Sequence, residues 1–338
     1  MSRFLFICFR GCCLGLIASY SFTLAAADDD KSKIKFDGFV RSMLDIESKG
    51  RGEIWHEGRL SAKSKRKNGF RGEVELEFET RTDSLEVLEA VIDRKLEDKW
   101  RWEAGYTQKR VGVEYEENRL ERATIDRTMM YRRLELFNYV GRENVVRLRK
   151  EDPSDRFNDW SLAAGFSESE NGSLIGNWQT ALPGIDARYG LWAEVGTDKI
   201  QDGVQTVFVL MNSLWHRSDS DLWQLEWAIG LDPQQSEFER IFANSEKVYF
   251  SGLNVLWGRR LSGDELENWS SIASATVFIH DHRQSAYNSL GIVLGVRYVL
   301  EDLRLSLTGE VIGTNSPVDV SKRTYDESSA KLEAIYVL

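Results

Sequence analysis

The chain has 338 residues, of which 42% are hydrophobic and 29% are charged, and its formal net charge is -10 at pH 7. The acidic balance excludes a nucleic acid as an obvious partner, and these totals alone are typical of a soluble protein of one or two domains. The aromatic content points elsewhere, because 11 tryptophans, 11 tyrosines and 16 phenylalanines stand beside only 4 prolines. Such a composition favours a strand-rich chain with aromatic side chains at a membrane interface.

Residues 1–27 are predicted to form a cleaved secretory signal peptide. Arg3 and Arg10 flank the start of this segment, an apolar run covers 11–24, and three successive alanines then supply a cleavage site of the A-x-A type. The apolar run is too short to be a membrane-spanning helix. All 3 cysteines of the chain lie in this segment, so the exported part, 28–338, is predicted to contain neither disulfides nor thiol chemistry.

Beyond the signal segment, most of the chain alternates between apolar and polar residues with a period of two, which predicts β-strands. In 69–81 phenylalanine, valine and leucine alternate with four glutamates, and 220–231 and 302–313 show the same alternation. The predicted strands are 33–47, 52–66, 69–81, 85–94, 98–108, 142–150, 158–168, 172–181, 186–199, 203–217, 220–231, 246–259, 268–282, 287–299, 302–313 and 328–338.

These strands predict an all-β fold, an antiparallel transmembrane β-barrel of about 16 strands, in the range of 14 to 18. Their lengths suffice to cross a bilayer, and short connections such as 219–220 and 301–302 alternate with long polar ones such as 232–245. The last strand, 328–338, is placed to close on the first. A soluble, exported β-sandwich would show similar alternation and is the alternative fold.

The connection 109–141 is long, rich in both charge signs and without steady alternation. Connections of this length in compact domains are usually functional, and we predict that it folds into the barrel and narrows a pore. Bases outnumber acids from Lys109 to Lys150 in an otherwise acidic chain, and arginine rings favour anions in a pore and can bind phosphate in a bidentate manner. The predicted constriction and anion-binding residues are Lys109, Arg110, Arg119, Arg122, Arg127, Arg132 and Arg133. Salt bridges within the loop are the alternative reading, and they would leave a general pore or a closed structural or adhesive barrel.

The same stretch resembles the phosphate-selective porin O and P family. That family carries a strand ending in Gly-Gln-Phe-Lys-x-Pro-Phe-Gly-Leu-Glu before its constriction loop, and Gly105, Gly112, Val113 and Glu114 fall at matching spacing. Arg110 stands where the family has proline. The resemblance implies a barrel of about sixteen strands, often trimeric, that passes small anions such as phosphate across the outer membrane of a Gram-negative-type bacterium.

The sequence offers only weak candidates for a metal site or a catalytic site. His280 and His282 share one strand face, but the sequence offers no third metal ligand. Ser213 and His216 are close in sequence, yet their odd spacing places them on opposite strand faces, which excludes a catalytic pair. We therefore expect no enzyme activity and no cofactor, and we expect outer-membrane lipid, small anions or other hydrophilic solutes, and copies of the chain in a homotrimer as partners.

Overall fold

The computed structural model describes most of the chain beyond the N-terminal segment, and the predicted signal peptide lies outside the described residues. The described residues are 34–65, 69–97, 99–116, 123–150, 159–166, 172–182, 184–200, 203–233, 247–261, 268–283, 285–316 and 322–338.

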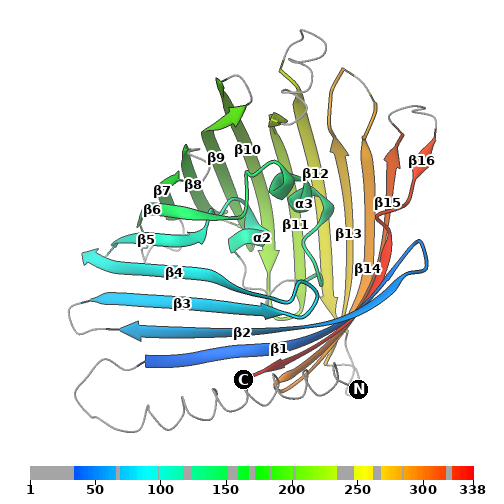
Figure 1. Cartoon of the computed structure of the whole chain (residues 1–338), viewed down its shortest axis with the longest axis horizontal. Helices are drawn as coiled ribbons and strands as arrows, with labels where there is room; N and C mark the ends of the chain where they lie inside the picture. Colours follow the sequence, from blue (N-terminus) through cyan, green and yellow to red (C-terminus); the bar gives the residue numbers. More distant parts are fainter. Residues whose placement is uncertain are drawn as a thin grey trace.

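One antiparallel sheet of 17 strands forms the body of the molecule (Figure 1). Its strands are β1 (Ile34–Glu47), β2 (Gly52–Lys65), β3 (Phe70–Glu79), β4 (Ser84–Glu97), β5 (Trp100–Gln108), β6 (Arg142–Lys150), β7 (Asp159–Phe166), β8 (Gly172–Leu182), β9 (Ala187–Ile200), β10 (Gly203–Arg217), β11 (Asp221–Leu231), β12 (Tyr249–Arg260), β13 (Trp269–Ile279), β14 (Ser289–Leu300), β15 (Leu303–Asn315), β16 (Arg323–Thr324) and β17 (Ser329–Val337).

The sheet closes into a barrel because β17 pairs with β1 as well as with β15. Phe39 pairs with Val337 and Glu47 with Ser329 at the closing seam. Closure leaves no unpaired strand edge, which is what a sheet needs in a medium without water. The two-residue β16 pairs only with the end of β15, at Thr314 and Asn315. The other sixteen strands match the sixteen predicted from the sequence, so the predicted fold class is confirmed.

The two faces of the barrel differ in the way the alternation predicts. On β15 the outward-facing Leu305 and Leu307 are 39% and 51% exposed, whereas the inward-facing Ser306 and Thr308 are buried. Leucine, valine and isoleucine occupy the middle of the outer face, and aromatic pairs lie near the strand ends. Trp100 and Trp160, for example, have ring centroids 4.8 Å apart. An apolar band flanked by aromatic side chains is the outer surface that suits a bilayer.

The connections divide between two rims. Connections such as 98–99, 218–220 and 301–302 lie on the rim that we call the turn rim, and the long connections, among them 109–141 and 232–248, lie on the opposite rim. The connection 109–141 contains two helices, α2 (Val113–Glu116) and α3 (Met129–Leu136). No helix in the described part of the chain is long and apolar enough to cross a membrane.

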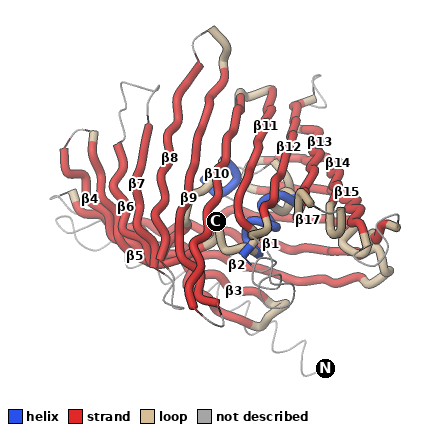
Figure 2. The backbone as a smooth tube through the Cα atoms, turned by 90° about the horizontal axis from the view of Figure 1, so that it is seen from above, coloured by secondary structure: helices blue, strands red, loops and turns tan. Residues whose placement is uncertain are grey.

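Both helices lie inside the barrel. In Figure 1, α2 and α3 are drawn over the wall formed by β10–β12, with β1–β4 below them. Figure 2 shows the helices in the interior with strands on all sides. The prediction of an inward-folded loop is therefore confirmed in its geometry, while its helical content was not predicted.

Candidate pore constriction

Lys109 joins the two ends of the inward loop at its base. Its backbone N–H donates to the carbonyl of Gly141 at 2.9 Å. Its ammonium group donates to the carbonyl of Asn138 at 2.6 Å and to Glu194 Oε1 at 3.0 Å, and Glu143 Oε2 lies 3.5 Å away. Lys109 is only 2% exposed, and a buried ammonium group needs such counter-charges. The structure thus places Lys109 in the packing between β6, β9 and the loop rather than on an open pore surface.

The side of the loop that faces β9–β13 is apolar. It packs against wall residues that include Phe250 and Phe278, and the Phe137 ring lies 5.2 Å from that of Phe250. A Cβ atom on the lumen-facing Gly252 would lie 3.0 Å from Met130 Sδ, so this glycine makes room for α3. Burying one large apolar side chain stabilises a structure by about 1.5–3 kcal/mol, so this contact anchors the loop. The loop residues in this apolar cluster are Val111, Val113, Tyr115, Met129, Met130, Tyr131, Leu134, Phe137, Tyr139 and Val140.

A buried carboxylate on β11 adds a polar anchor to this apolar contact. Tyr131 Oη donates to Glu226 Oε1 at 2.5 Å, and Ser213 Oγ donates to the same oxygen at 2.9 Å. Burial, together with the charges of Glu226 and Glu114, raises the pKa of Tyr131, so its hydroxyl keeps the donated proton. Gly112 has a φ of +81°, and a Cβ there would come within 2.1 Å of Tyr131 Oη, which is why only glycine fits.

The other side of α3 carries two of the predicted cations, and both reach carboxylates. Arg132 Nη2 donates to Glu310 Oε1 on β15 at 2.6 Å. Arg133 Nη2 donates to both carboxylate oxygens of Glu327, at 2.8 and 3.0 Å. Burial would lower the pKa of Arg132, but the charges of Glu310, Asp126 and Glu327 raise it above its usual value. Both guanidinium groups therefore tie α3 to the region around β15.

Asp126 fixes the stretch before α3 to the closing seam of the barrel. Its carboxylate accepts a hydrogen bond from Lys331 on β17, and Arg41 Nη2 on β1 lies 3.8 Å from Asp126 Oδ1. Arg41 is itself fully buried, with its Nε 2.7 Å from Glu333 Oε2. Burial would raise the pKa of Asp126, but Lys331, Arg41 and Arg132 lower it well below its ordinary range.

Arg110 and Arg127 have acidic partners that are close in sequence but lie at longer distances. The Arg127 guanidinium lies 3.6 Å from the centroid of the Tyr115 ring, and its Nη1 is 3.9 Å from Glu135 Oε2. Arg110 Nη2 is 3.6 Å from Glu103 Oε2 on β5. Each described member of the predicted cation set therefore has a carboxylate within 4.0 Å. Arg119 and Arg122 lie outside the described residues.

A strip of lumen-facing glutamates on β2–β4 completes the site. Arg59 on β2 links three members of the strip, with its Nε 3.1 Å from Glu57 Oε1 and 2.6 Å from Glu77 Oε2 and its Nη1 3.2 Å from Glu75 Oε1. Arg110 of the loop acts electrostatically on Glu89, so the loop and the strip influence each other. The strip consists of Glu57, Glu73, Glu75, Glu77, Glu79, Glu86 and Glu89.

The sequence carries a signal for this strip in 69–81. Glutamates at every second position of 69–81 predict one carboxylate-rich strand face, but a strand pattern does not show which wall faces the loop. The prediction therefore named the cations of the loop and left out the acids opposite them.

The remaining candidates are placed by the structure as follows. Ser213 faces the lumen and donates to Glu226, while His216 belongs to the opposite face of β10, as predicted. His280 follows the end of β13 and packs against Phe278, with ring centroids 4.9 Å apart. Among the residues that the structure describes, no group of three or more His, Cys, Asp or Glu side chains could hold a metal ion.

The architecture is similar to that of solved outer-membrane proteins. The channel DcaP of Acinetobacter baumannii aligns with a TM-score of 0.68 at 14% identity, over 92% of this chain and 99% of that one. OmpT of Vibrio cholerae, in its trimer form, aligns with a TM-score of 0.67 at 12% identity, over 91% of this chain and 100% of that one. An anion-selective porin from Comamonas acidovorans aligns with a TM-score of 0.62 at 8% identity, over 91% and 100%.

The likeness is one of fold. No protein-family model matches the sequence, and no curated protein matches it. The barrel architecture is shared with outer-membrane channels, whereas the resemblance to the phosphate-selective porin O and P family stays a prediction.

Proposed function

We propose that this protein is an outer-membrane porin, a passive diffusion channel for small hydrophilic solutes with a preference for anions such as phosphate. The observation that carries the proposal is the charged loop held inside a closed barrel whose outer face is apolar. A loop in that position narrows the lumen and lines it with ionisable groups, which is how pores select among small solutes.

The anion preference rests on the guanidinium groups of the loop. Arg132 and Arg133 lie on the side of α3 away from its apolar contact, and Arg110 and Arg127 act from the segments around α2. Guanidinium groups stay charged at all physiological pH values and bind phosphate oxygens through a planar fork. The fold likeness to a porin described as anion-selective is consistent with this preference.

A weakly selective general porin is the second candidate, and a specific observation favours it. The described cations of the set each have a carboxylate within 4.0 Å, and the glutamate strip on β2–β4 adds negative charge to the same lumen. Opposed charges would produce a field across the pore instead of a uniformly positive lining.

The proposal extends to location and assembly. The chain would lie in the outer membrane of a Gram-negative-type bacterium, exported by a cleaved signal peptide, with lipid around its apolar face. A homotrimer is part of the proposal, supported by the fold likeness to a protein solved in a trimer form.

The deciding experiment is the reversal potential of the purified protein in a planar bilayer under a KCl gradient, with and without phosphate. Anion-selective current that phosphate reduces supports the first candidate. Current without selectivity supports the general porin. An absence of current from correctly folded protein would reject both and leave a structural or adhesive barrel.

A further inference from the structure

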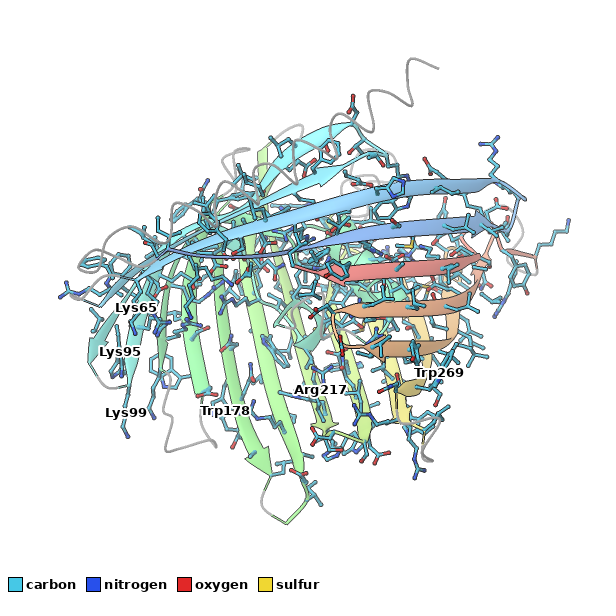
Figure 3. All side chains as sticks on the ribbon, turned by 90° about the horizontal axis from the view of Figure 1, so that it is seen from below. Lys65, Lys95, Lys99, Trp178, Arg217 and Trp269 are labelled. Atoms are coloured by element: carbon cyan, nitrogen blue, oxygen red, sulfur yellow. The ribbon has the colours of Figure 1, made fainter. Side chains whose placement is uncertain are left out.

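A hollow lies in the barrel at the turn rim, beside the ends of β10–β14. It is separate from the predicted constriction, and the proposed function assigns it no role. Its volume is about 510 Å³, within the usual range for small-molecule pockets. We call it the turn-end pocket, and define it by Arg217, Leu222, Gly258, Arg260, Ile272 and Arg297. Arg217 is labelled in Figure 3, as is Trp269, which lies at the start of β13 on the same rim.

The three arginines of this pocket face the lumen. Ser213, Asn254 and Val293 are buried lumen positions on β10, β12 and β14. Successive side chains alternate along a strand, so the even steps from these positions lead to Arg217, Arg260 and Arg297.

The charge of the pocket is positive. Four arginines and two aspartates, Asp219 and Asp221, line it. The fourth arginine, Arg259, belongs to the outer strand face. Its Nε lies 3.6 Å from Asp221 Oδ1, so Asp221 pairs with an arginine on the outer face.

The floor of the pocket is apolar. Ile272 is buried and packs with Leu256 and Ala123, with Leu222 against them. Ala123 belongs to the inward loop, and its carbonyl accepts a hydrogen bond from Arg297 Nη2 at 2.7 Å. The turn-end pocket therefore combines guanidinium groups with an apolar surface, and Ala123 is where it contacts the described part of the loop.

We propose that the turn-end pocket binds organic anions in which a carboxylate is carried on a small apolar or aromatic body. Arginine matches a carboxylate through its planar fork, and the floor of Leu222 and Ile272 would bury the apolar body, which a bare inorganic ion lacks. The inference rests on the proposed function in that it takes the ligand to be a solute of the channel, but binding at this site does not require conduction.

The test is isothermal titration calorimetry on the full chain in detergent, with benzoate as the probe. Acetate keeps the carboxylate without the apolar body, and benzyl alcohol keeps the body without the charge. We expect benzoate to bind at least about tenfold more tightly than either, which corresponds to about 1.4 kcal/mol.

Two variants of different kinds locate the site. Arg260→Gln removes one guanidinium group, and Gly258→Val fills the hollow without a backbone collision, because a Cβ at Gly258 meets its nearest atoms at 3.6 Å or more. We expect each to weaken benzoate binding by about tenfold. Arg81→Gln, at an arginine on the opposite rim with a 45% exposed side chain, is the matched control and should bind benzoate normally. Heat-dependent migration in gels checks that each variant is a folded barrel.

Each result decides a separate question. Acetate or benzyl alcohol binding as tightly as benzoate would overturn the inference, and so would benzoate binding that survives both pocket variants. No benzoate binding at all would overturn it as well. Benzoate binding without current in a planar bilayer would keep the pocket and remove the proposed channel function.

Discussion

The inward loop has one apolar side and one charged side. The contrast between them distinguishes the residues that position the loop from those that would set the ion selectivity of the proposed pore. Towards β9–β13 the loop is a continuous apolar cluster with two hydrogen-bonded wall carboxylates, Glu226 and, at the base of the loop, Glu194. Towards β15 and β17 it presents charged side chains that form direct ion pairs with the barrel and with Glu327.

The two sides differ in how much free energy they contribute. Apolar burial is worth about 1.5–3 kcal/mol per large side chain, whereas an exposed ion pair is worth about 0–1 kcal/mol. The apolar side therefore contributes most to where the loop lies, and an exposed pair such as Arg133 with Glu327 can be changed without moving it. Substitutions on the first side should alter the size of the pore, and substitutions on the second should alter which ions pass.

The largest effect is expected from Leu134→Asp in α3. Leu134 is fully buried against the wall, and an unpaired carboxylate there would cost several kcal/mol. The loop should detach, and single-channel conductance should rise. The neighbouring Glu135, whose side chain is half exposed, gives the control variant Glu135→Gln, which should conduct normally. Unchanged conductance in a folded Leu134→Asp barrel would contradict the anchoring role.

Lys109→Met should be nearly as damaging, because it leaves Glu143 and Glu194 without their shared counter-charge. Breaking a buried ion pair costs about 3–5 kcal/mol. The midpoint of denaturant unfolding, followed by tryptophan fluorescence in lipid vesicles, should fall. Lys109→Arg keeps the charge and should lose less, so equal losses in the two variants would argue against the ionic explanation.

Asp126 predicts a pH dependence. Its pKa is lowered in the folded protein, so its contribution is present above the ordinary value of about 3.9 and is lost as the pH falls through the folded value. Asp126 should therefore cause no change in conductance from about pH 5 to 8. Below about pH 4, current noise from loop movement should grow. Asp126→Asn should show the same noise at neutral pH, and quiet traces from that variant would reject the seam contact.

Arg110→Gln and Arg127→Gln test the charged side directly. One unit charge about 10 Å from the pore axis in water contributes about 0.4 kcal/mol, which is about a twofold change in the preference for anions. The reversal potential under a KCl gradient should shift toward cations in each variant, with conductance and unfolding midpoint unchanged. Glu89→Gln should shift it in the opposite direction, and a shift of the same sign would contradict the opposed arrangement.

The smallest effect on stability is expected from Arg133→Gln. Its partner Glu327 has a side chain that is 50% exposed, and such pairs contribute about 0–1 kcal/mol. The unfolding midpoint should hardly move, as it should in Glu327→Gln. A large destabilisation would mean that the pair supports the loop and would weaken the distinction between its two sides.

Strand alternation was enough to predict the barrel and its closure. The sequence pattern of 69–81, 220–231 and 302–313 shows directly which residues face inward and which face outward. In a barrel, one face of each strand meets an apolar exterior and the other meets a polar interior. The inward loop was predicted from its length and from the break in alternation.

The partners of the charged loop residues are determined by contacts between distant parts of the chain. Arg132 meets Glu310 and Asp126 meets Lys331, pairs separated by 178 and 205 residues. No local pattern encodes such pairs, because they depend on which wall the apolar side of the loop packs against. That choice is made by the fit of Met130 beside Gly252 and of Tyr131 against Glu226, and it appears only when the barrel has closed around the loop.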